Sequence, residues 1–246
     1  MVREARPAMK RAVILVVSLV GAMSGAHGEL VVRGTDVSGH RLIYDSILDV
    51  TWYDLRFGTT PWPDAVAWAD DLVVEFGGKV YGDWRLPKAE PVNGVAYDFA
   101  RANDGSADIG RNIVSPNAEL SHLFYVSLAN EYLDDDDFDP ALRNRGPFES
   151  LEYWYYWYGS EYQGPPRNGD LDTDGDGIRD TLADTRGFFF LFSNGNQSSW
   201  GGMTNLAMAV RDGDVSPIPV PAAGLLAMTG VIGMLPFARR RTKRDG

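Results

Sequence analysis

The chain of 246 residues contains no cysteine and only three histidines. Without cysteine it can form neither disulfide bonds nor thiolate metal sites, and it has no thiol for catalysis. Only His40 and His122 lie outside the N-terminal segment discussed below, which argues against a multi-histidine zinc or iron site. The sequence also lacks a serine-hydrolase elbow, a phosphate-binding loop and a metal-hydrolase motif.

Positive charge is scarce between the two ends of the chain. The whole sequence has 23 basic and 34 acidic residues, a net charge of −11. Residues 1–28 contain four basic residues and one acidic residue, and residues 221–246 contain five and one, so residues 29–220 retain 14 basic and 32 acidic residues, a net charge of −18. Such a segment repels phosphate backbones, so no nucleic-acid partner is expected. The acidic balance instead suits a cation-binding or soluble extracellular module.

The N-terminus has the three parts of a secretory signal peptide. Four basic residues precede a short apolar run, residues 12–23, and the small residues Ala26 and Gly28 follow at the spacing that a signal peptidase reads. The apolar run is too short to span a bilayer comfortably. We therefore expect residues 1–28 to be cleaved off near Gly28, with an uncleaved N-terminal anchor as the alternative.

The C-terminus, residues 215–246, combines a Pro-rich linker, an apolar segment and a basic cluster. The apolar segment, residues 222–238, is interrupted by Pro236 and followed by five basic residues. This is a stop-transfer pattern with its charged end in the cytoplasm, and its length is at the short limit for a span. A contact with the membrane through this segment is therefore expected.

The tail resembles the PEP-CTERM class of bacterial sorting signals, in the variant with a V-P-x-P-A-like motif. The motif stands at residues 217–223 as PIPVPAA, without a Glu between the prolines and with one Pro fewer than the usual core. The resemblance implies export by a Gram-negative bacterium, an inner-membrane-anchored precursor, processing by an exosortase, and a final location at the cell surface or in the extracellular matrix. A plain single-pass anchor is the alternative.

Hydrophobic periodicity predicts an α+β domain between the two ends. Apolar residues at helical spacing predict a helix from Pro63 to the glycine pair Gly77–Gly78, and a second helix is expected from Ser115 onward. Leu120, Leu123, Phe124 and Leu128 form the apolar face of this second helix. Strands are expected at residues 31–37, 42–44, 49–52, 153–158, 188–192 and 206–210, with a long loop at 88–114. Helices placed early and strands gathered late indicate the α+β class.

Several sequence blocks occur in the order that is typical of one bacterial family. They are LIYDSILDVTW (42–52), AWADDL (67–72), GDWRLP (82–87), ELSHLFY (119–125), GPF (146–148), YYWYGSEY (155–162) and AVRDGD (209–214). With these blocks the chain resembles the Lcl C-terminal domain family, which is related to C-type-lectin-like and sulfatase-modifying-factor folds. The resemblance covers nearly all of residues 40–214 and assigns the domain to residues 29–214. An insertion at about 163–187 is longer than the family usually has.

The resemblance implies a compact C-type-lectin-like domain with two helices and short, twisted, mostly antiparallel strands. It does not imply a single function, because fold and function are separable. The oxidase branch of the related folds needs reactive cysteines, which are absent here. The calcium-dependent sugar motifs of C-type lectins are also absent, and residues 90–93 (EPVN) only echo one of them.

The GDWRLP block invites a catalytic interpretation of Arg85. A structural one is favoured, because an arginine beside Trp and Leu-Pro more often donates hydrogen bonds that fix a loop. Trp68 and Trp84 are expected to belong to the core.

The acidic stretch DLDTDGDGIRD, residues 170–180, has the spacing of a calcium-binding loop. Calcium takes six to eight oxygens from a loop that alternates ligands and spacers, with Gly at the sharp turn. With Asp172 at position 1, Gly177 falls at position 6, but Ala183 occupies the twelfth position, where an acidic ligand belongs. The predicted Ca²⁺ ligands are Asp172, Asp174, Asp176, the carbonyl of Ile178, Asp180 and, if the loop bends, Asp184. A solvated acidic insertion without metal is the alternative.

The run YWYYWY, residues 153–158, places aromatic rings on both faces of an expected strand. We assign the face of Trp157 to the core, because this residue matches the recurring Trp of the family. Trp154, Tyr156 and Tyr158 then lie at or near the surface, where rings with polar tips can stack against sugars or a protein partner at the cell surface or in the matrix. The alternative is that the insertion folds over these three rings and buries them.

These patterns favour a non-catalytic surface module that binds carbohydrate or matrix polysaccharide at the cell envelope. A purely structural matrix protein is the second hypothesis. A glycosidase-type hydrolase is the third, because it needs two carboxylates across a cleft and no pair is singled out by the sequence.

Overall fold

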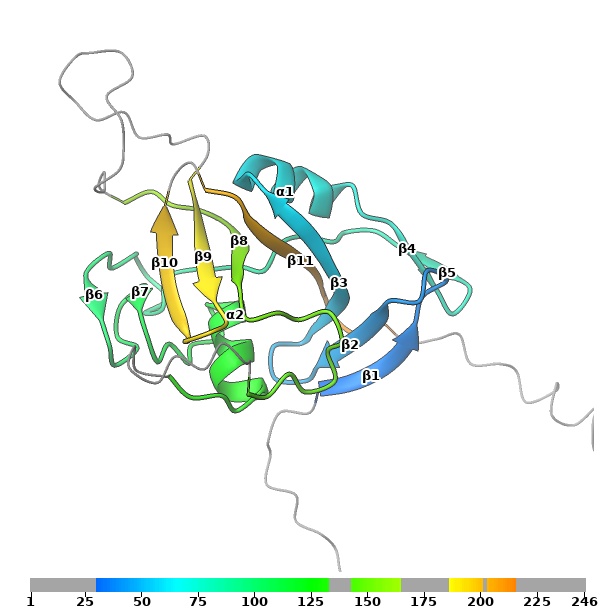
Figure 1. The fold of residues 1–246 in the computed structure, drawn as a ribbon, viewed down its shortest axis with the longest axis horizontal. Helices are drawn as coiled ribbons and strands as arrows, with labels where there is room; N and C mark the ends of the chain where they lie inside the picture. Colours follow the sequence, from blue (N-terminus) through cyan, green and yellow to red (C-terminus); the bar gives the residue numbers. More distant parts are fainter. Residues whose placement is uncertain (1–29, 133–142, 165–185, 201–202, 216–246) are drawn as a thin grey trace, which may run out of the picture.

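The computed structural model describes residues 30–132, 143–164, 186–200 and 203–215 (Figure 1). The expected signal peptide and the sorting tail therefore lie outside the described residues, as does the greater part of the acidic insertion. Within the described ranges, no helix has the length and apolar character needed to cross a membrane.

The described strands form a nine-stranded sheet and a separate two-stranded hairpin. Neighbouring strands of the large sheet run antiparallel, except for the parallel pairs β11–β8 and β6–β7. The last strand, β11, lies in the middle of the sheet and joins the N-terminal strands β1 to β3 to the later strands (Figure 1). In spatial order the strands are β1 (Leu30–Thr35), β2 (Arg41–Asp45), β3 (Val50–Thr60), β11 (Asn205–Asp212), β8 (Tyr155–Glu161), β9 (Gly187–Leu191), β10 (Asn196–Trp200), β7 (Ile109–Gly110) and β6 (Arg101–Ala102).

Helical segments cover both faces of the sheet. Helix α2 (Glu119–His122) continues into a π-helical segment, η1 (Leu123–Ser127), and packs on the face that carries Tyr156, Tyr158 and Phe190. Helix α1 (Trp62–Asp70) contacts β3, β8 and β11, and its side chains share a second apolar cluster with Trp157. The domain thus has two apolar layers, one on each side of β8. The prediction of a mixed domain with two α-helices and mostly antiparallel strands is confirmed for the described residues.

The first predicted helix is shorter than its periodicity suggests. Helix α1 ends at Asp70, and Val73, which was expected to be on the apolar face, is 65% exposed. The glycine pair does not end a helix but links β4 (Val74–Phe76) to β5 (Lys79–Tyr81), with Phe76 opposite Lys79. Gly77 and Gly78 have φ of 59° and 75°. Two consecutive positive φ values are what a two-residue hairpin turn requires, so the glycines are explained by this turn.

The second predicted helix has the predicted apolar face but begins later. Residues 115–118 form a turn, and the helix starts at Glu119. The four apolar residues of its expected face are all buried, so this part of the prediction is confirmed. Strands were found at all six expected places, with bounds that differ by up to eight residues at the end of β3. The sequence did not predict β10, nor β6 and β7 inside the long loop.

Candidate functional site

The two tyrosines that were expected at the surface are buried. Tyr156 is 1% exposed and Tyr158 is 0% exposed. The hydroxyl of Tyr158 accepts a hydrogen bond from the backbone N–H of Ser121 (3.0 Å) and donates one to Oε1 of Gln197 (2.7 Å). Burial raises the pKa of both phenols, so they remain protonated. The expected surface position is therefore wrong for Tyr156 and Tyr158, and their rings cannot stack on a ligand.

The physical reason is the second layer of the fold. Helix α2 and the π-helical segment cover the face of Tyr156 and Tyr158, with Phe124 packed 5.4 Å from Phe190 between ring centroids. The third residue of the predicted binding set, Trp154, is 47% exposed, which agrees with its expected surface position. It precedes β8, and its ring meets that of Tyr155 edge to face at 5.6 Å.

The face of Trp157 is only partly covered. At one end of the β8–β9 pair, Nε1 of Trp62 from α1 donates to the carbonyl of Tyr158 (2.8 Å), and Trp157 is fully buried. At the other end, where Tyr155 lies opposite Leu191, both residues are half-buried. An aromatic surface is thus present on the face that the sequence assigned to the core.

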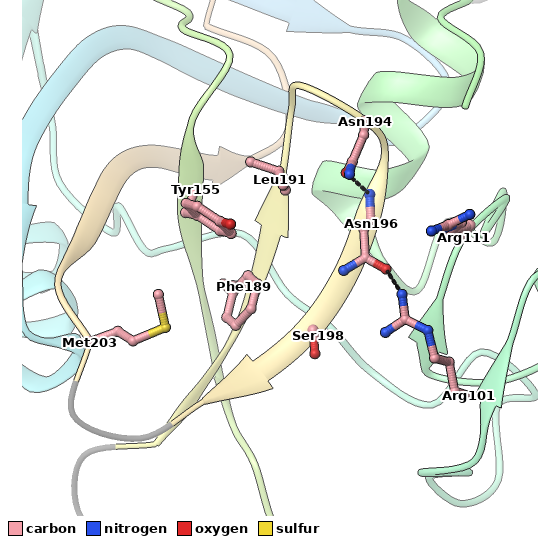
Figure 2. Close-up of a pocket in the computed structure, with 9 residues that line it drawn as sticks. All are labelled: Arg101, Arg111, Tyr155, Phe189, Leu191, Asn194, Asn196, Ser198 and Met203. Atoms are coloured by element: carbon pink, nitrogen blue, oxygen red, sulfur yellow. Dashed lines mark hydrogen bonds between the residues drawn. The ribbon is translucent and has the colours of Figure 1, made fainter. Parts of the chain in front are cut away.

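This uncovered end of the sheet forms a pocket of about 560 Å³, which we call the Tyr155 pocket (Figure 2). Tyr155, Phe189, Leu191 and Met203 form its apolar end. Asn194, Asn196 and Ser198, from the β9–β10 turn and from β10, lie between that end and two arginines, Arg101 and Arg111 (Figure 2). A concave apolar surface with a few converging polar groups is typical of a binding site for a small ligand.

Hydrogen bonds order the polar part of the pocket. Nη2 of Arg101 donates to Oδ1 of Asn196 (2.8 Å), and Oδ1 of Asn194 accepts the backbone N–H of Asn196 (3.2 Å). The amide of Asn196 is thereby held in the space between the arginine and the apolar end (Figure 2).

A glycine brings the two arginines into the same pocket. Arg101 begins β6 and Arg111 follows β7, and these strands pair through Gly110 opposite Ala102. Gly110 has φ of 137°, and a Cβ at this position would lie 1.7 Å from the carbonyl oxygen of Ala102. Only glycine permits this approach. Gly110 also lies opposite Gln197 of β10. The short strands that carry the two arginines are therefore held beside the strand that carries Asn196 and Ser198.

The two pocket arginines differ from most of the other described arginines. Among the described residues, neither Arg101 nor Arg111 forms an ion pair with a carboxylate. The guanidinium of Arg111 lies 3.8 Å from the ring centroid of Tyr132, and its buried Nε has no hydrogen-bond partner. By contrast, carboxylates pair with Arg33, Arg41, Arg56, Arg85 and Arg211.

The structural interpretation of Arg85 is confirmed. Its guanidinium donates to both carboxylate oxygens of Glu119 (2.7 and 2.8 Å) and to Asp212 (2.5 Å). Its backbone exchanges two hydrogen bonds with Val210 of β11. Arg85 therefore ties the GDWRLP loop to α2 and to the centre of the sheet. Trp84 is buried as expected, and Trp68 is half-buried and stacks on Phe57.

The predicted calcium ligands lie outside the described residues. These are Asp172, Asp174, Asp176, Ile178, Asp180 and Asp184. In the part of the chain that the structure describes, no group of three or more His, Asp or Glu side chains could hold a metal ion.

Sequence reasoning missed most of the Tyr155 pocket. Its residues come from β10, which is polar, and from short strands in a loop without periodicity. The one available signal was the aromatic alternation at β8, which identified the two faces but assigned Tyr155 to the core.

No protein-family model, curated protein or solved structure matches the chain.

Proposed function

We propose that the chain is an exported, non-catalytic binding module of the cell envelope or extracellular matrix, and that it binds carbohydrate through the Tyr155 pocket. The observation that supports this function is the combination of half-buried apolar and aromatic side chains with two side-chain amides in one concave surface, namely Tyr155, Leu191, Met203, Asn194 and Asn196. Aromatic rings stack on the apolar faces of sugars, and side-chain amides bond to their hydroxyls. Trp154, which contacts the ring of Tyr155, extends this surface.

The composition of the pocket supports binding over hydrolysis. Glycosidases of the usual kind place two carboxyl groups about 5 to 9 Å apart across the scissile bond. None of the nine described residues that line the Tyr155 pocket has a carboxylate. A purely structural matrix protein remains the alternative function, and it predicts no saturable binding of glycans.

The proposed location and fold family rest on the sequence. Export, sorting by an exosortase and a surface or matrix location follow from the signal peptide and the tail. A C-type-lectin-like domain of the Lcl C-terminal type is compatible with two helices on a mostly antiparallel sheet. Intact-mass analysis of the secreted protein tests both cleavages, and a tail retained through Arg244 in cells with the protease contradicts the sorting proposal.

A calcium ion is proposed at the acidic insertion, with Asp172, Asp174, Asp176, Ile178, Asp180 and Asp184 as its ligands. The incomplete twelfth position favours a dissociation constant of roughly 10⁻⁴ to 10⁻³ M. Millimolar calcium then adds about 1 kcal/mol to the free energy of unfolding. We expect a melting temperature a few degrees higher in calcium than in chelator, and we expect Asp174→Ala to remove the difference. Identical curves for the wild type in both conditions would refute the site.

Carbohydrate binding is tested on a glycan array with the mature secreted protein, in calcium and in chelator. For a glycan that binds, Tyr155→Ala is expected to weaken binding about tenfold, or ~1.4 kcal/mol, because the stacking ring is lost. Tyr44→Ala is the matched control, since Tyr44 of β2 is half-buried like Tyr155 and does not line the Tyr155 pocket. Equal loss in both variants, or no bound glycan at all, contradicts the proposed function.

A further inference from the structure

The Tyr155 pocket has a charge opposite to that of the domain. Residues 29–220 carry a net charge of −18, yet the described residues that line the pocket include two arginines and no acidic residue. Charges more than about 8 Å apart are largely screened at physiological ionic strength. The two arginines in the described lining therefore favour an anionic group in the pocket.

Neither arginine is neutralised by a carboxylate of the described residues. Two guanidinium groups in one pocket repel each other until an anion lies between them. Arg101 bonds only to the neutral amide of Asn196. Arg111 rests on the ring of Tyr132 and has a buried Nε without a partner. The planar guanidinium fork matches the planar carboxylate, with two parallel hydrogen bonds.

The layout of the pocket specifies what the anionic group is attached to. Figure 2 shows Arg101 and Arg111 on one side of Asn196, and Tyr155, Phe189 and Met203 on the other. A ligand that fills both ends needs a carboxylate at one end and a flat, partly apolar ring at the other. Hydroxyl groups are needed in between, where the amides of Asn194 and Asn196 lie. A six-membered sugar ring with a carboxylate satisfies all three requirements.

We propose that the Tyr155 pocket recognises a uronate unit of an acidic polysaccharide, with Arg101 and Arg111 bound to its carboxylate. This inference rests on the proposed carbohydrate-binding function and deepens it by naming the class of sugar. The net negative charge of the domain disfavours contacts of the polymer away from this pocket, so binding is expected to involve one sugar unit and its close neighbours.

The test is calorimetric titration of the mature protein with tetragalacturonate and with its fully methyl-esterified form. The ester keeps the rings and hydroxyl groups but removes the charges. We expect the acid to bind at least tenfold more tightly than the ester, because only the acid forms charge-assisted hydrogen bonds with the arginines. This comparison needs no protein variant, so it does not depend on the folding of one.

Variants then assign the effect to the arginines. Arg101→Gln and Arg111→Gln are each expected to weaken binding of the acid about tenfold and to weaken binding of the ester much less. Arg143→Gln makes the same change of charge at an exposed residue that does not line the pocket and is expected to have no effect. Tyr155→Ala weakens both ligands, since the ring contacts the sugar and not its charge.

The possible outcomes separate this inference from the proposed function. Equal affinity for acid and ester overturns the uronate assignment but leaves carbohydrate binding in place. Acid binding that survives substitution of both arginines overturns the assignment as well, as does binding of neither ligand. In the last case the glycan array decides whether the pocket binds other sugars.

Discussion

Replacing Tyr158 with alanine is expected to lower the free energy of unfolding by about 3–5 kcal/mol, the usual cost of removing a large aromatic side chain from a core. The ring is fully buried in the cluster that joins β8 to α2. Its hydroxyl also bonds to Ser121 and to the fully buried Gln197, whose amide in turn donates to the carbonyl of Asp108 (3.0 Å). The variant loses both the volume and the centre of this network. A domain with a stability of 5–15 kcal/mol approaches unfolding after such a loss.

Urea denaturation of matched variants separates packing from hydrogen bonding. Tyr158→Phe keeps the ring but leaves the N–H of Ser121 and the amide of Gln197 short of a partner, at a cost of about 1–3 kcal/mol. Trp154→Ala, at an exposed residue of the same aromatic run, is expected to change stability by about 0.5 kcal/mol or less. A Tyr158→Ala protein within 1 kcal/mol of the wild type would show that the ring is not part of the core.

The aromatic run illustrates what sequence periodicity can and cannot predict. Alternation along a strand correctly separates Tyr156 and Tyr158 from Tyr155 and Trp157. It does not say which face is covered, because the cover comes from a helix more than thirty residues earlier in the chain. Trp157 is buried as predicted, but so is the opposite face, and only the Tyr155 end is uncovered. The decision between the faces lies in tertiary contacts that no local pattern encodes.

Local signals were reliable where local physics decides the structure. The apolar spacing at Leu120, Leu123, Phe124 and Leu128 predicted a buried helical face, and these residues are buried. The glycine pair after Phe76 correctly indicated a break in secondary structure. It was predicted to end a helix, whereas it forms the turn of a hairpin. It could equally end a helix or turn a hairpin, since both use positive φ.

The arginines of the candidate site could not be found by such patterns. Arg101 and Arg111 lie in a stretch without hydrophobic periodicity, and their strands have only two residues each. They meet through the close approach of Gly110 to Ala102 and through pairing with β10. A glycine in a polar loop has many possible roles, so its part in this site is visible only from the sheet topology.

Replacing Arg85 with methionine is expected to destabilise the domain by about 3–5 kcal/mol, the usual effect of breaking a buried ion pair by removing one partner. Glu119 is buried, and its carboxylate also accepts the backbone N–H of Lys88 (2.6 Å). Without the guanidinium this negative charge remains in a desolvated position. The loop of residues 82–87 then loses its link to α2, and Asp212, at the end of β11, loses its hydrogen bond from Arg85.

The double variant Arg85→Met, Glu119→Gln provides the matched control, since it removes the charge that the single variant leaves buried. We expect it to regain part of the lost stability in urea denaturation.

The wild type should also lose stability in acid. The hydrogen bond from Arg85 lowers the pKa of Asp212, so the contribution of this carboxylate is fully present above its unfolded pKa of about 4 and is lost as the pH falls through the lower folded value. Arg85→Met should reduce this acid dependence. A single variant within 1 kcal/mol of the wild type, with the same dependence on pH, would show that Arg85 does not hold the loop to the sheet.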